Sequence, residues 1–281
     1  MRSALAHPLA QGRQFDVVKR SVQYALYSIA SPDLRLFPWL GGMNLIGMAG
    51  DSGYFRNYLH EFADMGFVAH FLQKDDLFLD GGANIGTWSM LAAGHGGASV
   101  ISVEPAVQTV AVLRANVALN GFAEGIRVVQ AALADGEGTA AMGTRGLTNA
   151  VRALDQMSAS DTVVRLTTLA LILGDQIPAL IKLDLEGYEI KALSGAGALL
   201  HAKKVLGWCI EANTRAEAID LYTVMSRAGY VNCYYDPLTR TLQTERPEPC
   251  WQNNSIYVRD LAEARARLAS GKSLEVFGRE I

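Results

Sequence analysis

The sequence has few cysteines, no long apolar run and no leader-like N-terminus. Its 281 residues include three cysteines, Cys209, Cys233 and Cys250, which are odd in number and widely spaced. This spacing fits neither a disulfide framework nor a zinc motif. No apolar run reaches the roughly 18 residues of a membrane span, and no charged region with an apolar region behind it opens the chain. We therefore expect a cytoplasmic protein without a membrane segment.

A large excess of positive or negative charge is also missing, and this argues against nucleic acid and membranes as partners. The chain carries 25 Lys and Arg against 28 Asp and Glu, a net charge of -3. Nucleic-acid-binding proteins gather basic residues on one face, and no block of like charge occurs here. Half of the residues are hydrophobic, so the chain can form one large domain, with or without an appendage. We expect neither nucleic acid nor a membrane as a partner.

The most informative stretch is residues 77–86, Leu-Phe-Leu-Asp-Gly-Gly-Ala-Asn-Ile-Gly. A short apolar run ends in Asp80, Gly81 and Gly82 follow, and apolar residues then recur at helical spacing. This order predicts a strand, a tight turn and a helix, as at the opening of a nucleotide-binding α/β domain. The glycines allow positive φ and a close approach of backbone to a ligand.

Asp80 indicates which ligand such a turn would take. A dinucleotide places its pyrophosphate at the turn, where a buried carboxylate would repel it. S-adenosylmethionine (SAM) has a cationic amino-acid end and no phosphate, so the sequence favours SAM over NAD. One alternative stays open, in which the turn only packs helix on strand and Asp80 is a solvated cap.

The next segment has the same order of strand, acid and helix. Residues 98–103 predict an apolar strand that ends at Glu104. An acid at the end of a second strand can accept both ribose hydroxyls of a nucleotide. Pro105 suits the first turn of the helix that follows, and Asn120-Gly121 is a stop signal.

From residue 75 onward, strand and helix patterns alternate, which predicts an α/β fold with a mostly parallel, doubly wound sheet. Further core strands are expected at 126–130, 180–184 and 205–211, a final antiparallel pair at 230–235 and 255–258, helices at 216–228 and 261–268, and two short extra strands at 139–142 and 162–166 around a polar loop at 143–161.

Residues 1–74 do not fit the sheet and predict an N-terminal helical cap on a domain of residues 75–281. A helix is expected at 15–29, a turn-rich apolar loop at 37–42, and one or two helices at 54–71. The aromatic residues of the cap either line a substrate pocket or attach the cap to the domain. The apolar helix at 15–29 also makes a homodimer possible.

A second acidic motif, Ile-Lys-Leu-Asp-Leu-Glu-Gly, occupies residues 181–187. Its strand brings Asp184 to the sheet edge where open α/β sheets bind ligands, and Glu186 follows two residues later. This pair can hold a cation, position a sulfonium or take a proton; alternatively, it caps the next helix. Glu211 ends the following strand and should reach the same edge.

Together these motifs resemble the FkbM family of SAM-dependent methyltransferases. They are Asp80-Gly-Gly-Ala-Asn-Ile-Gly86, Val103-Glu-Pro105, Asn116 with Asn120, and the run from Ile181 to Glu189. The resemblance extends from about Asp75 to Glu211 and leaves the first 74 residues unmatched. It implies a seven-stranded class I methyltransferase fold with the last strand antiparallel. It also implies O-methylation, typically of hydroxyls on secondary metabolites or sugars.

The resemblance also implies roles for single residues. Asp80, Gly82 and Asn84, with Gly81 between them, are implied contacts of the methionine end of SAM, Glu104 is the implied ribose acceptor, and Asp184 and Glu186 are the implied acids at the reactive centre. The chain departs from the pattern in having Ala170 where the family usually has Asp. Ala131-Ala132 also replaces the acid that binds adenine in many class I enzymes. Backbone groups, or Asp135 from the loop, are then expected to hold adenine.

A hydroxyl acceptor must lose its proton, and a positioned base contributes roughly 10²- to 10⁴-fold to such a step. The candidates are Asp184, Glu186, Glu211 and a histidine from the cap. Asp184, Glu211 and Asn213 carry oxygen ligands that Mg²⁺ accepts, but their spacing is not diagnostic and no metal is expected. Alternatives left open are N- or C-methylation, a non-catalytic SAM-binding accessory protein and an NAD-dependent dehydrogenase. The substrate is expected to be a small molecule.

Overall fold

The computed structural model describes residues 7–30, 34–48, 55, 57–145, 148–152, 154–244 and 254–281. Cys250 and Tyr54, the first residue of the helices expected at 54–71, lie outside these residues. Within the described ranges, no helix is long and apolar enough to cross a bilayer.

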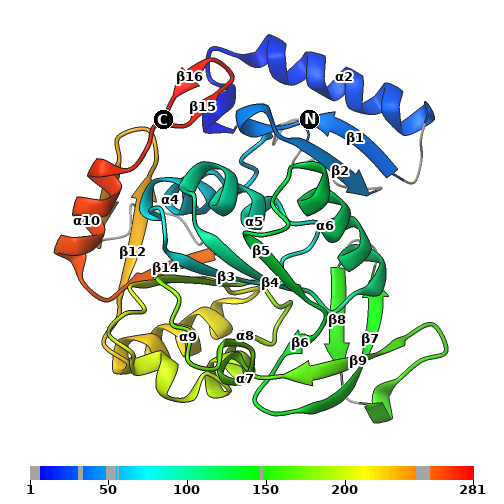
Figure 1. Ribbon diagram of the computed structural model, residues 1–281, viewed down its shortest axis with the longest axis vertical. Coiled ribbons are helices and arrows are strands. Elements are labelled where there is room, and N and C mark those ends of the chain that lie inside the picture. Colours follow the sequence, from blue (N-terminus) through cyan, green and yellow to red (C-terminus); the bar gives the residue numbers. More distant parts are fainter. Residues whose placement is uncertain are drawn as a thin grey trace.

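A central sheet organises the chain, with strand order β13-β12-β14-β11-β10-β3-β4-β5 (Figure 1). The strands are β3 (Leu77–Gly81), β4 (Ser99–Val103), β5 (Ile126–Val129), β10 (Leu180–Leu183), β11 (Gly207–Glu211), β12 (Val231–Asp236), β13 (Thr241–Gln243) and β14 (Asn254–Val258). Those from β5 to β11 are parallel, and β14 is antiparallel to both β11 and β12. The expected sheet is confirmed, and β13 adds a strand at its edge by pairing with β12.

Helices cover both faces of this sheet, so the doubly wound prediction is confirmed. The helical elements are α4 (Phe62–Phe71), α5 (Thr87–Leu91), η3 (Ala92–Gly96), α6 (Val107–Leu119), α7 (Leu169–Leu173), α8 (Glu189–Ser194), η5 (Gly197–His201), α9 (Arg215–Arg227) and α10 (Leu261–Ser270). In Figure 1, α4, α5 and α6 lie on one side of the sheet, and α7, α8 and α9 on the other. All residues of β10 are buried, as expected for a strand covered on both faces.

The N-terminal segment contains a hairpin besides its helices. Before α4, its described elements are η1 (Pro8–Ala10), α2 (Gln14–Ala30), β1 (Leu34–Pro38), η2 (Leu40–Gly42) and β2 (Asn44–Met48). The apolar turn expected at 37–42 joins β1 to β2, which pair antiparallel. The side-chain oxygens of Asn116 and Asn120 accept the backbone N–H groups of Ile46 and Asn44 at 2.6 and 2.8 Å. These bonds from α6 stabilise a strand that short local patterns did not indicate.

A second, four-stranded sheet is inserted after β5, in the order β6-β9-β7-β8. Its elements are β6 (Ala132–Leu133), β7 (Gly138–Arg145), β8 (Thr148–Arg152), η4 (Leu154–Gln156) and β9 (Thr162–Thr167). The two predicted strands are confirmed, but the prediction of a loop throughout 143–161 is wrong. Strand β8 pairs with the extended β7, and its Val151 packs on a small apolar cluster around Met142. A short C-terminal hairpin, β15 (Glu275–Val276) and β16 (Arg279–Glu280), was not predicted.

Candidate active site

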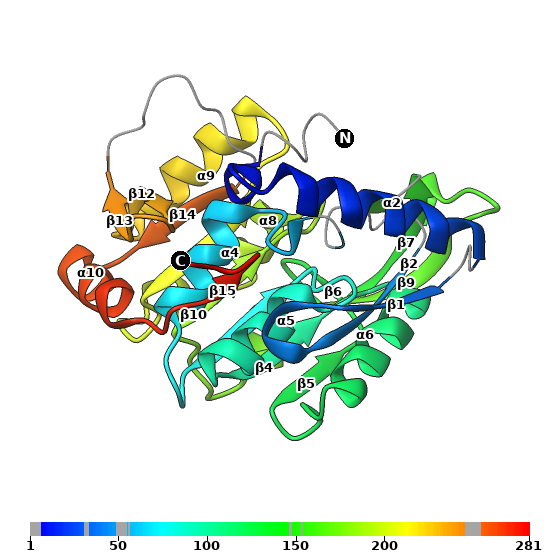
Figure 2. The same cartoon turned by 90° about the horizontal axis from the view of Figure 1, so that it is seen from above.

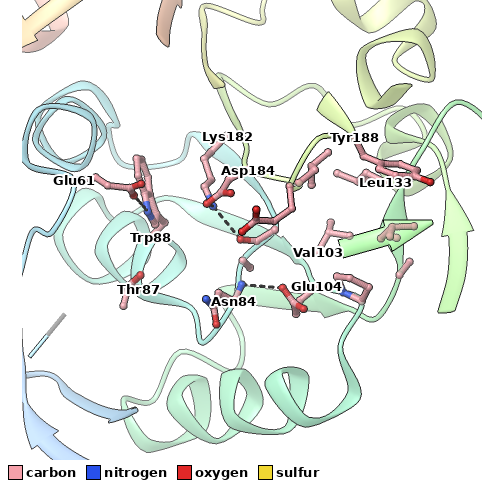
Figure 3. A pocket seen from close by; sticks show the side chains of 18 of the residues that line it. Glu61, Asn84, Thr87, Trp88, Val103, Glu104, Leu133, Lys182, Asp184 and Tyr188 are labelled. Atoms are coloured by element: carbon pink, nitrogen blue, oxygen red, sulfur yellow. Dashed lines mark hydrogen bonds and ion pairs between the residues drawn. The ribbon is translucent and has the colours of Figure 1, made fainter. Parts of the chain in front are cut away.

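A pocket opens at the carboxyl ends of β3, β4 and β10 (Figure 3). This is the edge at which doubly wound sheets bind ligands. Its wall consists of His60, Glu61, Gly82, Ala83, Asn84, Thr87, Trp88, Val103, Glu104, Pro105, Ala131, Ala132, Leu133, Val151, Lys182, Asp184, Leu185, Glu186 and Tyr188. The N-terminal segment contributes His60 and Glu61 to the wall, and the inserted sheet contributes Ala132, Leu133 and Val151. The described aromatic residues of the cap do not line the pocket; all but one on helix α2 pack in or against the core cluster, which fits the alternative that they attach the cap to the domain.

The turn between β3 and α5 forms the pocket floor. Gly82 has φ +73°, and a Cβ there would collide with the backbone carbonyl oxygen of Asp184, so only glycine fits. Asn84, in the same turn, also has positive φ and lines the pocket. Gly81 lies within β3 between Leu133 and Leu183 and is outside the wall, so its position supports packing.

Asp80 does not lie where the sequence argument placed it. Its side chain is fully buried and absent from the pocket wall, and it accepts a hydrogen bond from Ser89 Oγ at 2.6 Å. The ammonium group beside Asp80 is that of Lys182, whose Nζ lies 3.6 Å from Asp80 Oδ1, and not that of a ligand. The Asp80 carboxylate therefore balances an internal cation below the pocket.

Lys182 holds the centre of the site together (Figure 3). Its Nζ donates to Gly82 O at 2.9 Å and lies 3.2 Å from Asp184 Oδ2. Burial opposes its charge, but the carboxylates of Asp184, Asp80 and Glu61 outweigh burial and raise the pKa of Lys182. It therefore remains a fixed cation at neutral pH.

Glu104 is positioned by two backbone donors. Oε1 accepts the N–H of Ala106 at 2.9 Å, and Oε2 accepts the N–H of Asn84 at 3.1 Å. Burial raises the pKa of Glu104 to about 7 in spite of these two donors. A carboxylate has about four acceptor sites, so this group can accept further hydrogen bonds from ligand hydroxyls.

Asp184 and Glu186 both line the pocket, as the motif predicted. The turn that carries them is fixed by Glu189, whose Oε1 accepts the N–H of Leu185 at 2.6 Å. Glu186 has φ +54°, an uncommon conformation for a non-glycine residue. Burial and the nearby Asp184 raise the pKa of Glu186.

Besides Asp80 and Gly81, two further predicted site residues, Glu211 and Asp135, do not line this pocket. Glu211 is absent from the pocket wall, and burial, together with the neighbouring Asp184, raises its pKa. Asp135 is exposed. The part of the pocket wall that follows β5 in the sequence is formed by the apolar residues Ala131, Ala132 and Leu133, and not by an acid.

The sequence reasoning missed one acid, Glu61, and offered a histidine of the cap only as one of four candidate bases, without saying which. Glu61 accepts from Trp88 Nε1 at 3.1 Å and from Asn254 Nδ2 at 3.0 Å, and His60 Nε2 lies 3.2 Å from its Oε2. Burial opposes ionisation of Glu61, but His60, Lys182 and Asn254 outweigh it and lower the pKa to about 2. No local motif marks His60 or Glu61, because the residues that hold them come from α5 and β14. Within the described residues, no group of three His, Cys, Asp or Glu side chains is arranged to hold a metal ion.

The sequence profile described as "Methyltransferase FkbM domain" matches residues 80–231, from the end of β3 to the start of β12. The chain belongs to the FkbM methyltransferase family. The match includes both acidic motifs and the inserted sheet, but leaves out the N-terminal segment with His60 and Glu61. No curated protein sequence matches this chain.

Solved structures of low sequence identity are also similar to this chain. An FkbM methyltransferase from Methylobacillus flagellatus KT is 19% identical over 66% of this chain and 43% of its own, less than half its length, with a TM-score of 0.47. A SAM-dependent methyltransferase from Agrobacterium tumefaciens is 14% identical, with 81% and 71% coverage and a TM-score of 0.45. A putative transferase from Pyrococcus horikoshii is 15% identical, with the same coverage and TM-score.

Proposed function

We propose that this methyltransferase transfers the methyl group of SAM to a hydroxyl group of a small molecule. The observation that carries the proposal is Glu104. Its carboxylate is held by two backbone donors at the end of β4, between a glycine turn and an apolar wall. SAM supplies a methyl group that its sulfonium has already activated, so the protein mainly has to align donor and acceptor.

The pocket residues fit SAM in shape and charge. Glu104 would accept the ribose hydroxyls, and the apolar wall of Pro105, Ala132 and Leu133 suits the adenine ring. Gly82 leaves the turn open to close approach, since no side chain projects from it. The wall carries Glu61, Asp184 and Glu186 against the single lysine Lys182, and this negative excess favours a cationic donor over a pyrophosphate.

His60 is the base in this proposal, oriented by Glu61. A general base must come within hydrogen-bond reach of the proton that it takes, and His60 lies in the pocket wall. Glu61 stays ionised, because its pKa is about 2, and is itself fixed by Trp88 and Asn254. It can therefore hold the imidazole in one orientation and stabilise the imidazolium formed when the acceptor loses its proton.

SAM binding is tested by calorimetry on the intact chain, on Glu104→Gln and on the exposed control Glu137→Gln. Hydrogen bonds to charged groups contribute more than neutral ones, so Glu104→Gln is expected to weaken binding roughly 10- to 100-fold. Glu137→Gln should bind like the intact chain. If the folded intact chain does not bind SAM, the proposal is wrong.

The pH dependence of SAM affinity gives a second readout on Glu104. Ribose hydroxyls donate to the ionised carboxylate, whose pKa in the free protein is about 7. Affinity should therefore fall below pH 7, by up to about tenfold per pH unit, and level off above it. Glu104→Gln should flatten this profile, and an unchanged slope would contradict the ribose contact.

The base is tested with labelled-methyl transfer to a panel of hydroxyl, amine and carbon acceptors. His60→Gln should slow transfer roughly 10²- to 10⁴-fold with an unchanged SAM affinity, whereas the exposed control His201→Gln should not. If Glu186→Gln slows methyl transfer by this amount and His60→Gln does not, Glu186 is the base instead. Transfer only to amine or carbon acceptors would overturn O-methylation while keeping the donor.

A further inference from the structure

Helix α2 has a face that packs on other described residues and an opposite face that is exposed. It lies at the rim of the molecule in Figure 1 and over the rest of the fold in Figure 2. Val17 is fully buried, and the guanidinium of Arg20 lies 3.8 Å from the centre of the Tyr58 ring. The ring of Tyr24 lies 5.6 Å from that of Phe55. These contacts hold the helix without using its other face.

The other face is apolar and exposed. Its side chains, which we call the α2 stripe, are Phe15 (79% exposed), Val18 (36%), Val22 (52%), Leu26 (61%) and Ile29 (83%). At 3.6 residues per turn they form one continuous row, opposite Val17, Arg20 and Tyr24. An amphipathic helix normally turns such a row toward a core, so a row that faces outward marks an interaction surface.

The α2 stripe is symmetric about Val22. Phe15 and Ile29 are equally distant from it in sequence, and so are Val18 and Leu26. We infer that a second copy of this chain covers the stripe, with the two α2 helices antiparallel across a twofold axis at Val22. Phe15 then packs on Ile29 of the partner subunit, Val18 on Leu26 of the partner subunit, and Val22 on its own copy. Such a self-complementary patch is what a twofold interface requires.

Charge agrees with this pairing, and area limits its strength. The stripe itself has no charged residue, so no charge is buried where its apolar side chains meet. Antiparallel helices also place opposite dipole ends together. Burying five such side chains removes roughly 300–600 Å² per subunit, at roughly 60–120 Å² each. This is below the roughly 800 Å² per partner of a standard interface, so we expect a dimer that dissociates at micromolar concentrations.

A lipid surface fits the α2 stripe less well. Helices that lie on membranes carry Lys and Arg on the polar face next to the apolar one. In α2, Arg20 points to the packed face, where it stacks on Tyr58, and Arg13 at the start of the helix is paired with Asp16 at 3.9 Å. Little basic charge therefore remains beside the stripe to attract anionic lipid.

The dimer is tested by measuring molar mass by sedimentation between roughly 1 and 100 µM, where an interface of this size should dissociate. Val22→Glu places two like charges on the axis and should give a monomer throughout. Gln23→Glu, one residue away but off the stripe, should dimerise like the intact chain. An intact chain that stays monomeric, or a dimer that survives Val22→Glu, would overturn the inference.

Cysteine cross-linking tests the register. Val22→Cys should form a covalent dimer on mild oxidation, because residue 22 meets its own copy at the axis. Phe15→Cys and Ile29→Cys should not cross-link singly but should when mixed; the intact chain, whose Cys209 and Cys233 are buried, is the control. Cross-linking of Phe15→Cys by itself would indicate parallel helices and contradict the register.

Binding of the monomer to anionic phosphatidylserine vesicles, lost in Val22→Glu, would assign the stripe to lipid instead. The dimer does not depend on the proposed chemistry, so SAM binding by Val22→Glu should be unchanged.

Discussion

At the scale of single residues, the site depends on one buried cation. Lys182 stands alone among apolar residues in β10 and is 4% exposed. It contacts the Asp80 and Asp184 carboxylates and the carbonyl of Gly82, so it joins β3 to the turn after β10. Removing one partner of a buried ion pair leaves a charge without compensation, which costs more than the pair itself contributes.

We therefore expect Lys182→Met to lower the free energy of unfolding by about 3–5 kcal/mol in urea titrations near neutral pH. The exposed control Lys203→Met should change it by less than about 0.5 kcal/mol. Adding Asp80→Asn to Lys182→Met should recover part of the loss, because it removes the carboxylate left uncompensated. Equal effects of Lys182→Met and Lys203→Met would contradict the account of Lys182.

At the scale of elements, the turn between β3 and α5 brings two neighbouring strands within contact distance. Gly82 faces the backbone of Asp184, and β3 and β10 pair in parallel just before that point. Glycine is therefore needed at position 82 for two reasons: its φ is positive, and the backbone of Asp184 occupies the space of a Cβ. Gly136, in the turn between β6 and β7, meets nothing within 4 Å of its added Cβ and has no positive φ.

We expect Gly82→Ala to destabilise the fold by about 1–3 kcal/mol and to weaken SAM binding, since the turn must move away from Asp184. Gly136→Ala should be close to neutral in both measurements. Thermal unfolding and calorimetry on the two variants give the comparison. Similar behaviour of the two variants would show that the turn tolerates a side chain.

At the scale of the whole molecule, the first and last thirds of the chain meet around His70. This residue of α4 is fully buried, and its Nδ1 lies 2.6 Å from the hydroxyl of Tyr235 in β12. Helix α10 packs on the same helix α4. Burial, assisted by Arg240, lowers the pKa of His70 to about 4.

The lowered pKa predicts a loss of stability in acid. Unfolded chains bind a proton at His70 below about pH 6.5, whereas the folded chain does so only near pH 4. The stabilisation is therefore complete above about pH 6.5 and decreases toward pH 4, by at most about 3 kcal/mol. Burial raises the pKa values of Asp64 and Glu104 to about 7, so the stability of the fold that depends on these two carboxyls decreases as the pH rises.

A difference measurement isolates His70 from those carboxyls. The unfolding free energy of the intact chain minus that of His70→Gln should decrease between about pH 7.5 and 4.5. The same difference for the exposed His201→Gln should stay constant. A constant difference for His70→Gln would mean that His70 titrates normally in the fold.

Much of the fold followed from local patterns. Apolar runs before Asp80, Glu104 and Asp184 marked the parallel strands, and the glycine turn marked the pocket floor. Strand β8 was missed because its pairing with β7 and the packing of Val151 lie outside the local pattern. The hairpin of β1 and β2 was missed for a similar reason, since Asn116 and Asn120 hold it from a distant helix.

The site shows where sequence reasoning ended. Glu104, Asp184 and Glu186 were found because each directly follows a strand, and parallel strands end at one edge. The Asp80–Lys182 pair was not found because its two residues are distant in sequence. The adjacent His60 and Glu61 were not found because Trp88 and Asn254, which hold Glu61, are distant in sequence. By itself, the sequence determined the order of strands and helices, the glycine turn and the acids at the sheet edge, since these depend on neighbours along the chain. Only the tertiary structure decided which charges compensate one another, which acids face the pocket and which face of α2 stays exposed, because burial and pairing depend on segments that meet only in the folded chain.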